Sequence, residues 1–174
     1  ESLVPVAQSA GIATIVVEDT QTAGRLGVDG LQLGQDPVAL RDAIDRFSPQ
    51  MMVGAGNVKT RHNALVLGEL QPDYLMFGKP GGDTRPEPHP KNLALGQWWS
   101  TIVEIPCIVL GGNTIDSVIV TAQSGSDFVA LGSAIFAPNE DAKNDQNLRT
   151  AAQRVQAANQ LLDEHAPPFE ILSE

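Results

Sequence analysis

The sequence contains a single cysteine, Cys107, among its 174 residues. A disulfide within the chain is therefore impossible. A lone cysteine is typical of proteins that work in a reducing compartment, so we expect a cytoplasmic protein. Cys107 lies in the apolar stretch Ile105–Leu110, and this context predicts a buried side chain rather than a reactive thiol.

Basic residues and long apolar runs are also scarce. The chain has 11 Lys and Arg against 21 Asp and Glu, a net charge of −10. A nucleic-acid surface needs clustered basic side chains, so we expect no nucleic-acid partner, although local basic spots can still bind phosphate. No run approaches the roughly 20 apolar residues of a membrane span, and the first residues do not have the pattern of a secretory signal. We therefore expect no membrane association.

Short apolar runs are what the chain does contain, and they recur every 20 to 25 residues or so. Six runs rich in β-branched residues lie at 12–17, 31–33, 51–55, 74–77, 105–110 and 128–131. They are continuous rather than alternating, which predicts strands of a parallel sheet covered on both faces. Helix-forming segments lie between them, with starts predicted at Asp19 or Thr20, at Asp36, at Thr60, at Pro90 and at Thr114 with Asp116. The pattern predicts one α/β domain over residues 1–174, with a C-terminal helix and tail from about residue 140.

An aspartate precedes several of these runs. Gly27-Val28-Asp29 and Gly125-Ser126-Asp127 each end one helix and lead into a strand, and Asp73 stands before 74–77 in the same way. Glycine tolerates the left-handed conformation that ends a helix. We expect the aspartates to accept hydrogen bonds from backbone amides where the strands begin, which is a structural role.

Two glycine turns follow the last two predicted strands. Gly111, Gly112 and Asn113 come after Leu110, while Gly132 and Ser133 come after Leu131 and open a short helix. A phosphate needs several backbone N–H donors at once, glycine permits the close approach, and a helix N-terminus adds partial positive charge. In eight-stranded α/β barrels the loops after the last two strands form such a phosphate site. The turns therefore predict an anion site, provided that they lie together with their amides free.

Four segments, in order, resemble those of one known family. DGLQLGQD resembles DGVHLGQED, and PDYLMFGKPGGDTR resembles ADYVGxGPxFxTxTK. IPCIVLGGNTIDSV resembles IPVVAIGGITxxNV, and SGSDFVALGSAIF resembles AGADGVAVVSAI. The family is that of the thiamine-phosphate synthases and their relatives, the TenI-type thiazole tautomerases. The similarity runs from about Pro5 to Phe136.

The resemblance implies a TIM (β/α)8 barrel of the thiamine-phosphate-synthase type. Placed on that family, the chain begins after the first two strands, so that Ile12–Val17 is the third strand and Phe128–Leu131 the eighth. Six strands do not close such a barrel. The first two strands are thus expected to be absent from this chain or supplied by another chain, so a homo-oligomer is possible. The family's second strand also carries residues that hold the pyrimidine substrate, and none can be assigned here.

The resemblance also implies a reaction. The family joins hydroxymethylpyrimidine diphosphate to thiazole phosphate and releases pyrophosphate, so the expected partners are small phosphorylated heterocycles. Charge on the leaving pyrophosphate is stabilised by Mg²⁺ and cationic side chains. By position, Asp19 and Asp36 match the family's magnesium ligands. This chain has Asp36-Pro37 where the family has Glu-Asp, a shift of one residue, and the alternative role of Asp36 is to cap the next helix.

Three candidate catalytic residues follow from the same alignment. Asn57 and Lys59 fall on the serine and the histidine of the family's GVSxHT segment, where they could contact a diphosphate. Arg85 matches a lysine that contacts pyrophosphate. Candidate substrate-binding residues are Lys79, Thr84, Gly111, Gly112, Asn113, Gly132 and Ser133. The segment from Lys79 to Pro90 holds four prolines and two glycines, which predicts a long loop, often a lid at this end of a barrel.

Two alternatives stay open beside the synthase. The first is a TenI-type thiazole tautomerase, which the replacement of the family's histidine by Lys59 disfavours. The second is a non-catalytic paralogue that binds a phosphorylated thiazole. It is favoured by departures from the family pattern at Glu18, Pro37, Asn57, Lys59 and Lys79, all near the presumed diphosphate position.

Overall fold

The computed structural model describes residues 3–137 and 144–167. The chain divides into two compact units, Glu1–Met76 and Phe77–Glu174, which are described separately. Parts of the predicted C-terminal tail, at 138–143 and 168–174, lie outside the described residues.

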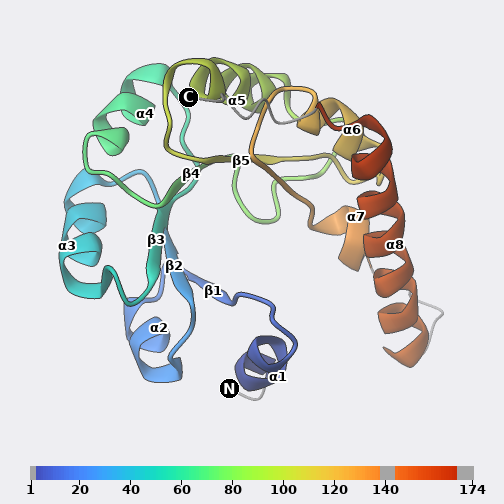
Figure 1. The fold of residues 1–174 in the computed structure, drawn as a ribbon, viewed down its shortest axis with the longest axis horizontal. Helices are drawn as coiled ribbons and strands as arrows, with labels where there is room; N and C mark the ends of the chain where they lie inside the picture. Colours follow the sequence, from blue (N-terminus) through green and yellow to red (C-terminus); the bar gives the residue numbers. More distant parts are fainter. Residues whose placement is uncertain (1–2, 138–143, 168–174) are drawn as a thin grey trace, which may run out of the picture. The chain divides into compact units, whose positions relative to one another are not determined.

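The first unit alternates strands and helices (Figure 1). Its elements are α1 (Leu3–Ser9), β1 (Ile15–Val17), α2 (Thr20–Leu26), β2 (Gly30–Leu33), α3 (Pro37–Phe47), β3 (Met52–Ala55), α4 (Arg61–Gly68) and most of β4 (Tyr74–Phe77). Strands β1, β2, β3 and β4 pair in chain order, and every pair is parallel. Helices α2, α3 and α4 lie on the same side of these strands. Each helix thus connects one strand to its parallel neighbour.

The predicted helix starts of this unit are confirmed. The side chains of Asp19, Asp36 and Thr60 each accept a hydrogen bond from a backbone amide in the first turn of the helix that follows. Helix α2 ends at Gly27, which has a φ of 61°, so the predicted left-handed cap is present. Capping residues predict helix starts well, because each one accepts a hydrogen bond from an amide of the first turn that has no partner within the helix.

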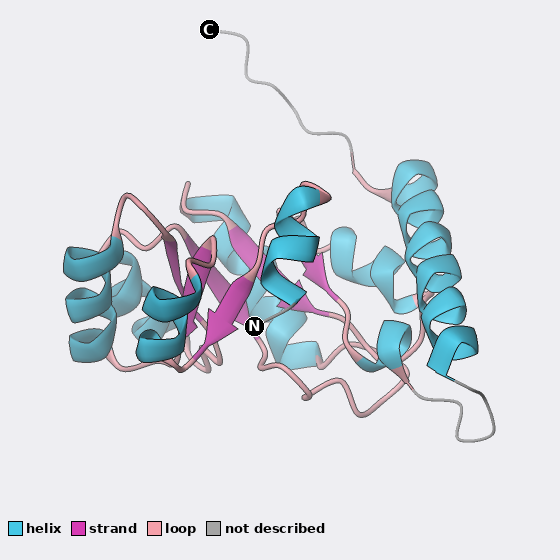
Figure 2. Ribbon diagram, turned by 90° about the horizontal axis from the view of Figure 1, so that it is seen from below, coloured by secondary structure: helices cyan, strands magenta, loops and turns pink. Residues whose placement is uncertain are grey.

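The second unit continues the alternation. It contains the end of β4, then α5 (Pro90–Ile102), β5 (Cys107–Leu110), α6 (Ser117–Ala122), β6 (Phe128–Ala130), α7 (Ser133–Phe136) and α8 (Asn144–His165). Strands β5 and β6 are parallel neighbours. The long helix α8 packs against α6 and α7 (Figures 1 and 2). The Arg154 guanidinium of α8 donates to the carbonyl oxygens of Ile135 (3.1 Å) and Ala137 (3.2 Å), which links α8 to the end of α7. Among the described helices, none is both long and apolar enough to cross a membrane.

Helix α6 begins at Ser117, three residues later than predicted. The amides of Ser117, Val118 and Ile119 bond to carbonyls three residues earlier, which is the pattern of tight turns. The Ser117 hydroxyl donates to the Thr114 carbonyl (2.6 Å) and accepts from the Gly112 amide (2.9 Å). The segment from Thr114 to Asp116 is therefore a turn built around the Ser117 hydroxyl. Of the two residues predicted to open this helix, Thr114 is wrong, while Asp116 is the residue directly before α6, without a side-chain cap bond.

Burial differs between inner and outer strands. All residues of β2 and β4 are buried, as continuous apolar runs predict. In β1, by contrast, Ile15 and Val17 are 41% and 44% exposed, and in β6 Phe128 is 60% exposed. The prediction of strands covered on both faces is therefore right for β2 and β4 and wrong for β1 and β6. Cys107 is fully buried, as predicted, and burial raises the pKa of its thiol to about 12.

The aspartates that precede the strands have the predicted structural role. Asp29, Asp73 and Asp127 each accept a backbone N–H from the preceding strand or the residue before it. The donors are Thr14 (2.7 Å), Val53 (2.7 Å) and Cys107 (2.8 Å). One polar residue type thus satisfies an amide at the start of three strands.

The Asp29 carboxyl should make the stability of the fold depend on pH. The Thr14 amide and hydroxyl hold the pKa of this carboxyl below its usual value of 3.8. A depressed pKa contributes stability above the unfolded value, and that stability is lost as pH falls through the folded value. We expect Asp29→Asn to be less stable than the wild type at pH 7 and the difference to shrink below about pH 4.

Urea unfolding at pH 7, 5 and 3 measures this difference. Thr14→Val, which removes only the hydroxyl donor, should show the same trend with a smaller amplitude. A difference between wild type and Asp29→Asn that is the same at all three pH values would contradict the assignment.

Candidate functional site

Asp19 lies two residues after the last residue of β1, at the carboxyl end of the strand. Its carboxylate accepts hydrogen bonds from the Thr22 amide (2.8 Å) and the Thr22 hydroxyl (2.6 Å). The hydroxyl and then the amide lower the pKa of Asp19. The preceding residue, Glu18, has a φ of 62°, a left-handed conformation that is uncommon for a residue with a side chain. Unusual backbone at a strand end is typical of functional sites.

Asp36 lies after β2, the parallel neighbour of β1. Its Oδ1 accepts the Val38 amide at 2.9 Å, which is the helix-cap role. The Glu18 side chain leans toward the same strand end, because its Oε1 would lie 2.9 Å from a Cβ on Gly34. Carboxylate oxygens of Glu18, Asp19 and Asp36 are thus presented by two adjacent strand ends of the first unit. Among the described residues, no group of three or more acidic, His or Cys side chains is close enough to hold a metal unaided.

Asn57 and Lys59 follow β3. Asn57 is half-buried with a φ of 58°, and Lys59 is exposed. Thr60, next in sequence, caps α4 through its hydroxyl, which accepts the Asn63 amide at 3.1 Å. The two candidate side chains therefore stand on a short segment whose backbone is set by a left-handed residue and a helix cap.

A buried polar pair in this unit was not predicted. The Tyr74 hydroxyl donates to Gln32 Oε1 at 3.2 Å, and both side chains are only 6% exposed. Burial raises the pKa of Tyr74 to about 12. The tyrosine ring covers Gly54, where an added Cβ would lie 2.2 Å from the ring. The one available signal was a glutamine inside an otherwise apolar strand, Leu31-Gln32-Leu33.

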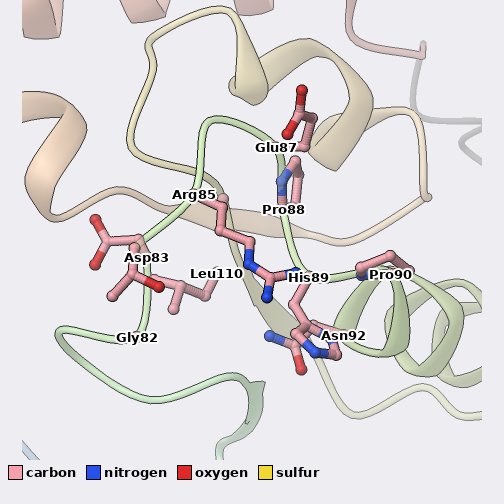
Figure 3. Close-up of a pocket in the computed structure, with 11 residues that line it drawn as sticks. Gly82, Asp83, Arg85, Glu87, Pro88, His89, Pro90, Asn92 and Leu110 are labelled. Atoms are coloured by element: carbon pink, nitrogen blue, oxygen red, sulfur yellow. The ribbon is translucent and has the colours of Figure 1, made fainter.

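In the second unit, the segment from Gly78 to His89 forms no helix or strand, as predicted for 79–90. Lys79, Thr84 and Arg85 are exposed. The segment and the end of β5 border a cavity of about 440 Å³ (Figure 3). In Figure 3 Arg85 reaches toward His89 and Asn92, while the Asp83 carboxylate points the other way. The candidate cation thus faces the cavity.

The two glycine turns of the second unit lie side by side. The Gly111 amide donates to the Ala130 carbonyl at 2.9 Å, which continues the pairing of β5 with β6 past the strand ends. Gly132 and Ser133 follow the end of β6 after one intervening residue, and α7 begins at Ser133. The first condition for an anion site, proximity of the two turns, is met.

The second condition, free amides, is not met in this structure. The Gly112 amide donates to the Ser117 hydroxyl (2.9 Å), and the Asn113 amide donates to the Arg85 carbonyl (2.8 Å). The Ser133 amide donates to a carboxylate oxygen of Asp83. The expectation of open amides is therefore corrected: with the Gly111 amide bonded to Ala130, protein groups occupy four of the donors.

Asp83 is the residue that sequence reasoning missed. Its side chain is 4% exposed, and its second oxygen, Oδ1, is buried with no hydrogen-bond partner. A buried carboxylate with an unsatisfied oxygen is rare and calls for an explanation. The sequence offers no stronger signal than its position, directly before Thr84-Arg85.

The family model and the curated relatives that match this chain name the same family. The model of a family described as thiamine monophosphate synthase matches residues 1–135. The thiamine-phosphate synthase of Erythrobacter litoralis is 32% identical over 149 residues, 82% of this chain and 68% of that protein. Those of Rhodospirillum centenum and Hyphomonas neptunium are 32% and 30% identical over 78% and 75% of this chain. The chain spans 66% and 59% of these two relatives, so it covers about two thirds or less of their length.

Solved structures agree on the fold. A thiamine phosphate pyrophosphorylase from Pyrococcus furiosus superposes with a TM-score of 0.69 at 20% identity, covering 92% of this chain and 74% of that one. A 3-hexulose-6-phosphate synthase gives a TM-score of 0.62 at 16% identity, covering 86% of this chain and 79% of the other. The predicted fold is confirmed: parallel α/β, of the thiamine-phosphate-synthase barrel type, with six strands.

Proposed function

Because the chain belongs to the thiamine monophosphate synthase family, we propose that it joins hydroxymethylpyrimidine diphosphate to thiazole phosphate and releases pyrophosphate. The observation that carries the proposal is the family match over residues 1–135, which ends in α7, just after the second glycine turn. The tight turns after β5 and β6 are thus part of what the chain shares with the family. A cytoplasmic setting fits small phosphorylated substrates and a lone, buried cysteine.

Each unit supplies residues with a defined task. In the second unit, the turns at Gly111–Asn113 and Gly132–Ser133 would bind the thiazole phosphate through the Asn113 and Ser133 amides, after the groups of the 83–86 segment that now accept these amides are displaced. Arg85 would bind the pyrophosphate, because a guanidinium can donate two parallel hydrogen bonds to phosphate oxygens. In the first unit, Asn57 and Lys59 would donate to phosphate oxygens of a substrate. The reaction needs no protein nucleophile, so positioning and charge stabilisation are the tasks of these side chains.

Magnesium fits the first unit when its coordination is completed by the substrate. Asp19 uses one hydrogen bond at each oxygen, and Asp36 uses Oδ1, so both carboxylates keep lone pairs for a cation. Mg²⁺ commonly takes one or two carboxylates, with phosphate oxygens and water filling its other positions. Asp19, with Asp36 or Glu18, would hold it, and bound Mg²⁺ would neutralise charge on the leaving pyrophosphate.

The test is turnover by the full-length protein supplied with both substrates and Mg²⁺. We expect thiamine phosphate to form, and we expect Asp19→Asn to lower the rate at least about tenfold. Asparagine also caps helices well, so the melting temperature should stay close to that of the wild type. The loss of rate would then report the carboxylate charge rather than the cap. No product from the wild type would refute the proposal.

A second candidate is a phosphate-binding paralogue without catalysis. It is favoured by the use of both Asp19 and Asp36 as helix caps, together with the departures at Glu18, Pro37, Asn57, Lys59 and Lys79. Titration calorimetry separates the two. The synthase should bind thiazole phosphate and, with Mg²⁺, the pyrimidine diphosphate, whereas the paralogue should bind only the first.

A further inference from the structure

We propose that the Asp83 carboxylate is an internal occupant of the anion site formed by the turns after β5 and β6, and that a phosphorylated ligand binds there by displacing it. The inference rests on the proposed function only in taking these turns as a phosphate site. It adds a competing group that belongs to the protein itself, and so a step of loop release before binding.

The contacts of one short segment support it. From Asp83 to Pro86 the chain touches both turns. The Asp83 carboxylate accepts the Ser133 amide, and the Arg85 carbonyl accepts the Asn113 amide at 2.8 Å. The Pro86 carbonyl accepts the Thr114 hydroxyl at 3.0 Å. A ligand that used these donors would have to replace the whole segment.

The place that Asp83 takes suits an anion. Its oxygens Oδ2 and Oδ1 would lie 3.0 Å and 3.2 Å from a Cβ on Gly132, so a side chain there would press on the carboxylate, whereas glycine does not. The donor, Ser133, is the first residue of α7. A carboxylate and a phosphate both present negatively charged oxygens to such an amide, and these charge-assisted bonds are stronger than neutral ones.

The unsatisfied oxygen shows that Asp83 fills this place imperfectly. Oδ1 is buried and has no hydrogen-bond partner. Burying a charged or polar oxygen without a partner is unfavourable, so the closed arrangement is easier to displace than a fully bonded one. A phosphate, which has more oxygens than a carboxylate, can engage the Ser133 and Asn113 amides together.

The segment is built to move without disturbing the strands. Gly81 has a φ of 73° and open space around its Cα, and Lys79 to Gly82 are exposed. At the other end, the His89 side chain caps α5 by accepting the Lys91 amide at 3.2 Å. Release of Asp83 would also take a negative charge out of the site, which favours an incoming phosphate.

Titration of inorganic phosphate into the intact chain, followed by calorimetry, tests the proposal. Asp83→Asn keeps the size of the side chain but replaces the charged carboxylate by a neutral amide, whose oxygen competes less well with phosphate for the Ser133 amide. The affinity for phosphate is lowered by the fraction of molecules in which the site is closed. We therefore expect Asp83→Asn to bind phosphate at least about tenfold more tightly than the wild type. Asp163→Asn, the same change on the exposed side of α8, should bind like the wild type.

Three outcomes would overturn it. Equal affinity of wild type and Asp83→Asn would show that Asp83 does not compete, while phosphate binding itself would still support the proposed function. Weaker binding by Asp83→Asn would make Asp83 a group that helps the ligand. No phosphate binding by any variant would remove the anion site, and turnover of the two substrates by the wild type would then show whether the proposed function fails with it.

A second measurement needs no variant. In ¹H–¹⁵N NMR spectra of the wild type, added phosphate should shift the amide signals of Ser133, Asn113 and Asp83 with one common midpoint. A shift at Ser133 and Asn113 that leaves Asp83 unchanged would contradict displacement. This keeps the proposal testable even if Asp83→Asn does not fold.

Discussion

Replacing Trp99 with alanine should lower the free energy of unfolding by about 3–5 kcal/mol. Trp99 is fully buried in the second unit, and its ring meets Phe77 edge-on with centroids 6.2 Å apart. Its indole N–H donates to the Ile105 carbonyl at 2.7 Å. Truncation removes the largest fully buried side chain among the described residues and leaves that carbonyl without its donor.

Urea unfolding followed by far-ultraviolet circular dichroism measures the loss without using tryptophan fluorescence. Trp99→Phe keeps an aromatic ring and removes the N–H, so it should cost about 1–2 kcal/mol. Ile102→Ala, on the same helix at a side chain that is 56% exposed, should cost less than about 1 kcal/mol. A loss below about 1 kcal/mol for Trp99→Ala would mean that this helix does not anchor the unit.

Gly54→Ala should lower the stability of the first unit more than alanine at any other described glycine of that unit. The added Cβ would lie 2.2 Å from the Tyr74 ring, far inside contact distance. The ring cannot move aside freely, because it is buried and its hydroxyl is bonded to Gln32. Forcing atoms into a filled core usually costs about 1–3 kcal/mol, and we expect the upper end of that range here.

The control is another glycine of the same unit. Gly24 lies inside α2, and its added Cβ would meet Phe47 at an ordinary 3.7 Å, so Gly24→Ala should be neutral or stabilise by up to about 1 kcal/mol. A double-mutant cycle adds a second check. Gly54→Ala should cost much less in a Tyr74→Ala background, because the clashing ring is gone. Equal cost in both backgrounds would locate the strain elsewhere.

The fold was largely predictable because its signals are local. Apolar runs marked all six strands, and capping residues such as Asp36 and Thr60 marked helix starts. The strand-entrance aspartates Asp29 and Asp127 were also predicted, since each satisfies an amide at the start of a strand. Caps and turns depend on neighbours in the sequence, so the sequence alone is enough to place them.

The site was less predictable because its contacts are long-range. Asp83 meets Ser133 across 50 residues, and Tyr74 meets Gln32 across 42. The residues around Asp83 and Tyr74 in the sequence do not indicate which distant residue each side chain contacts. The glycine turns were predicted to lie together, and they do, but only the three-dimensional path of the 79–90 loop shows that their amides are taken. The proline and glycine content of residues 79–90 predicted a loop, but it did not predict that this loop covers the amides of the two glycine turns.

The buried Cys107 has a practical consequence for studying that loop. It is the single sulfhydryl in the sequence, it is fully shielded, and its pKa of about 12 keeps it protonated at neutral pH. Alkylating reagents attack the ionised form, so the natural protein presents almost no target to them. A cysteine introduced at the exposed residue Glu87 would therefore accept a fluorophore or spin label at one known position. Movement of the segment could then be followed in real time without first removing any native residue.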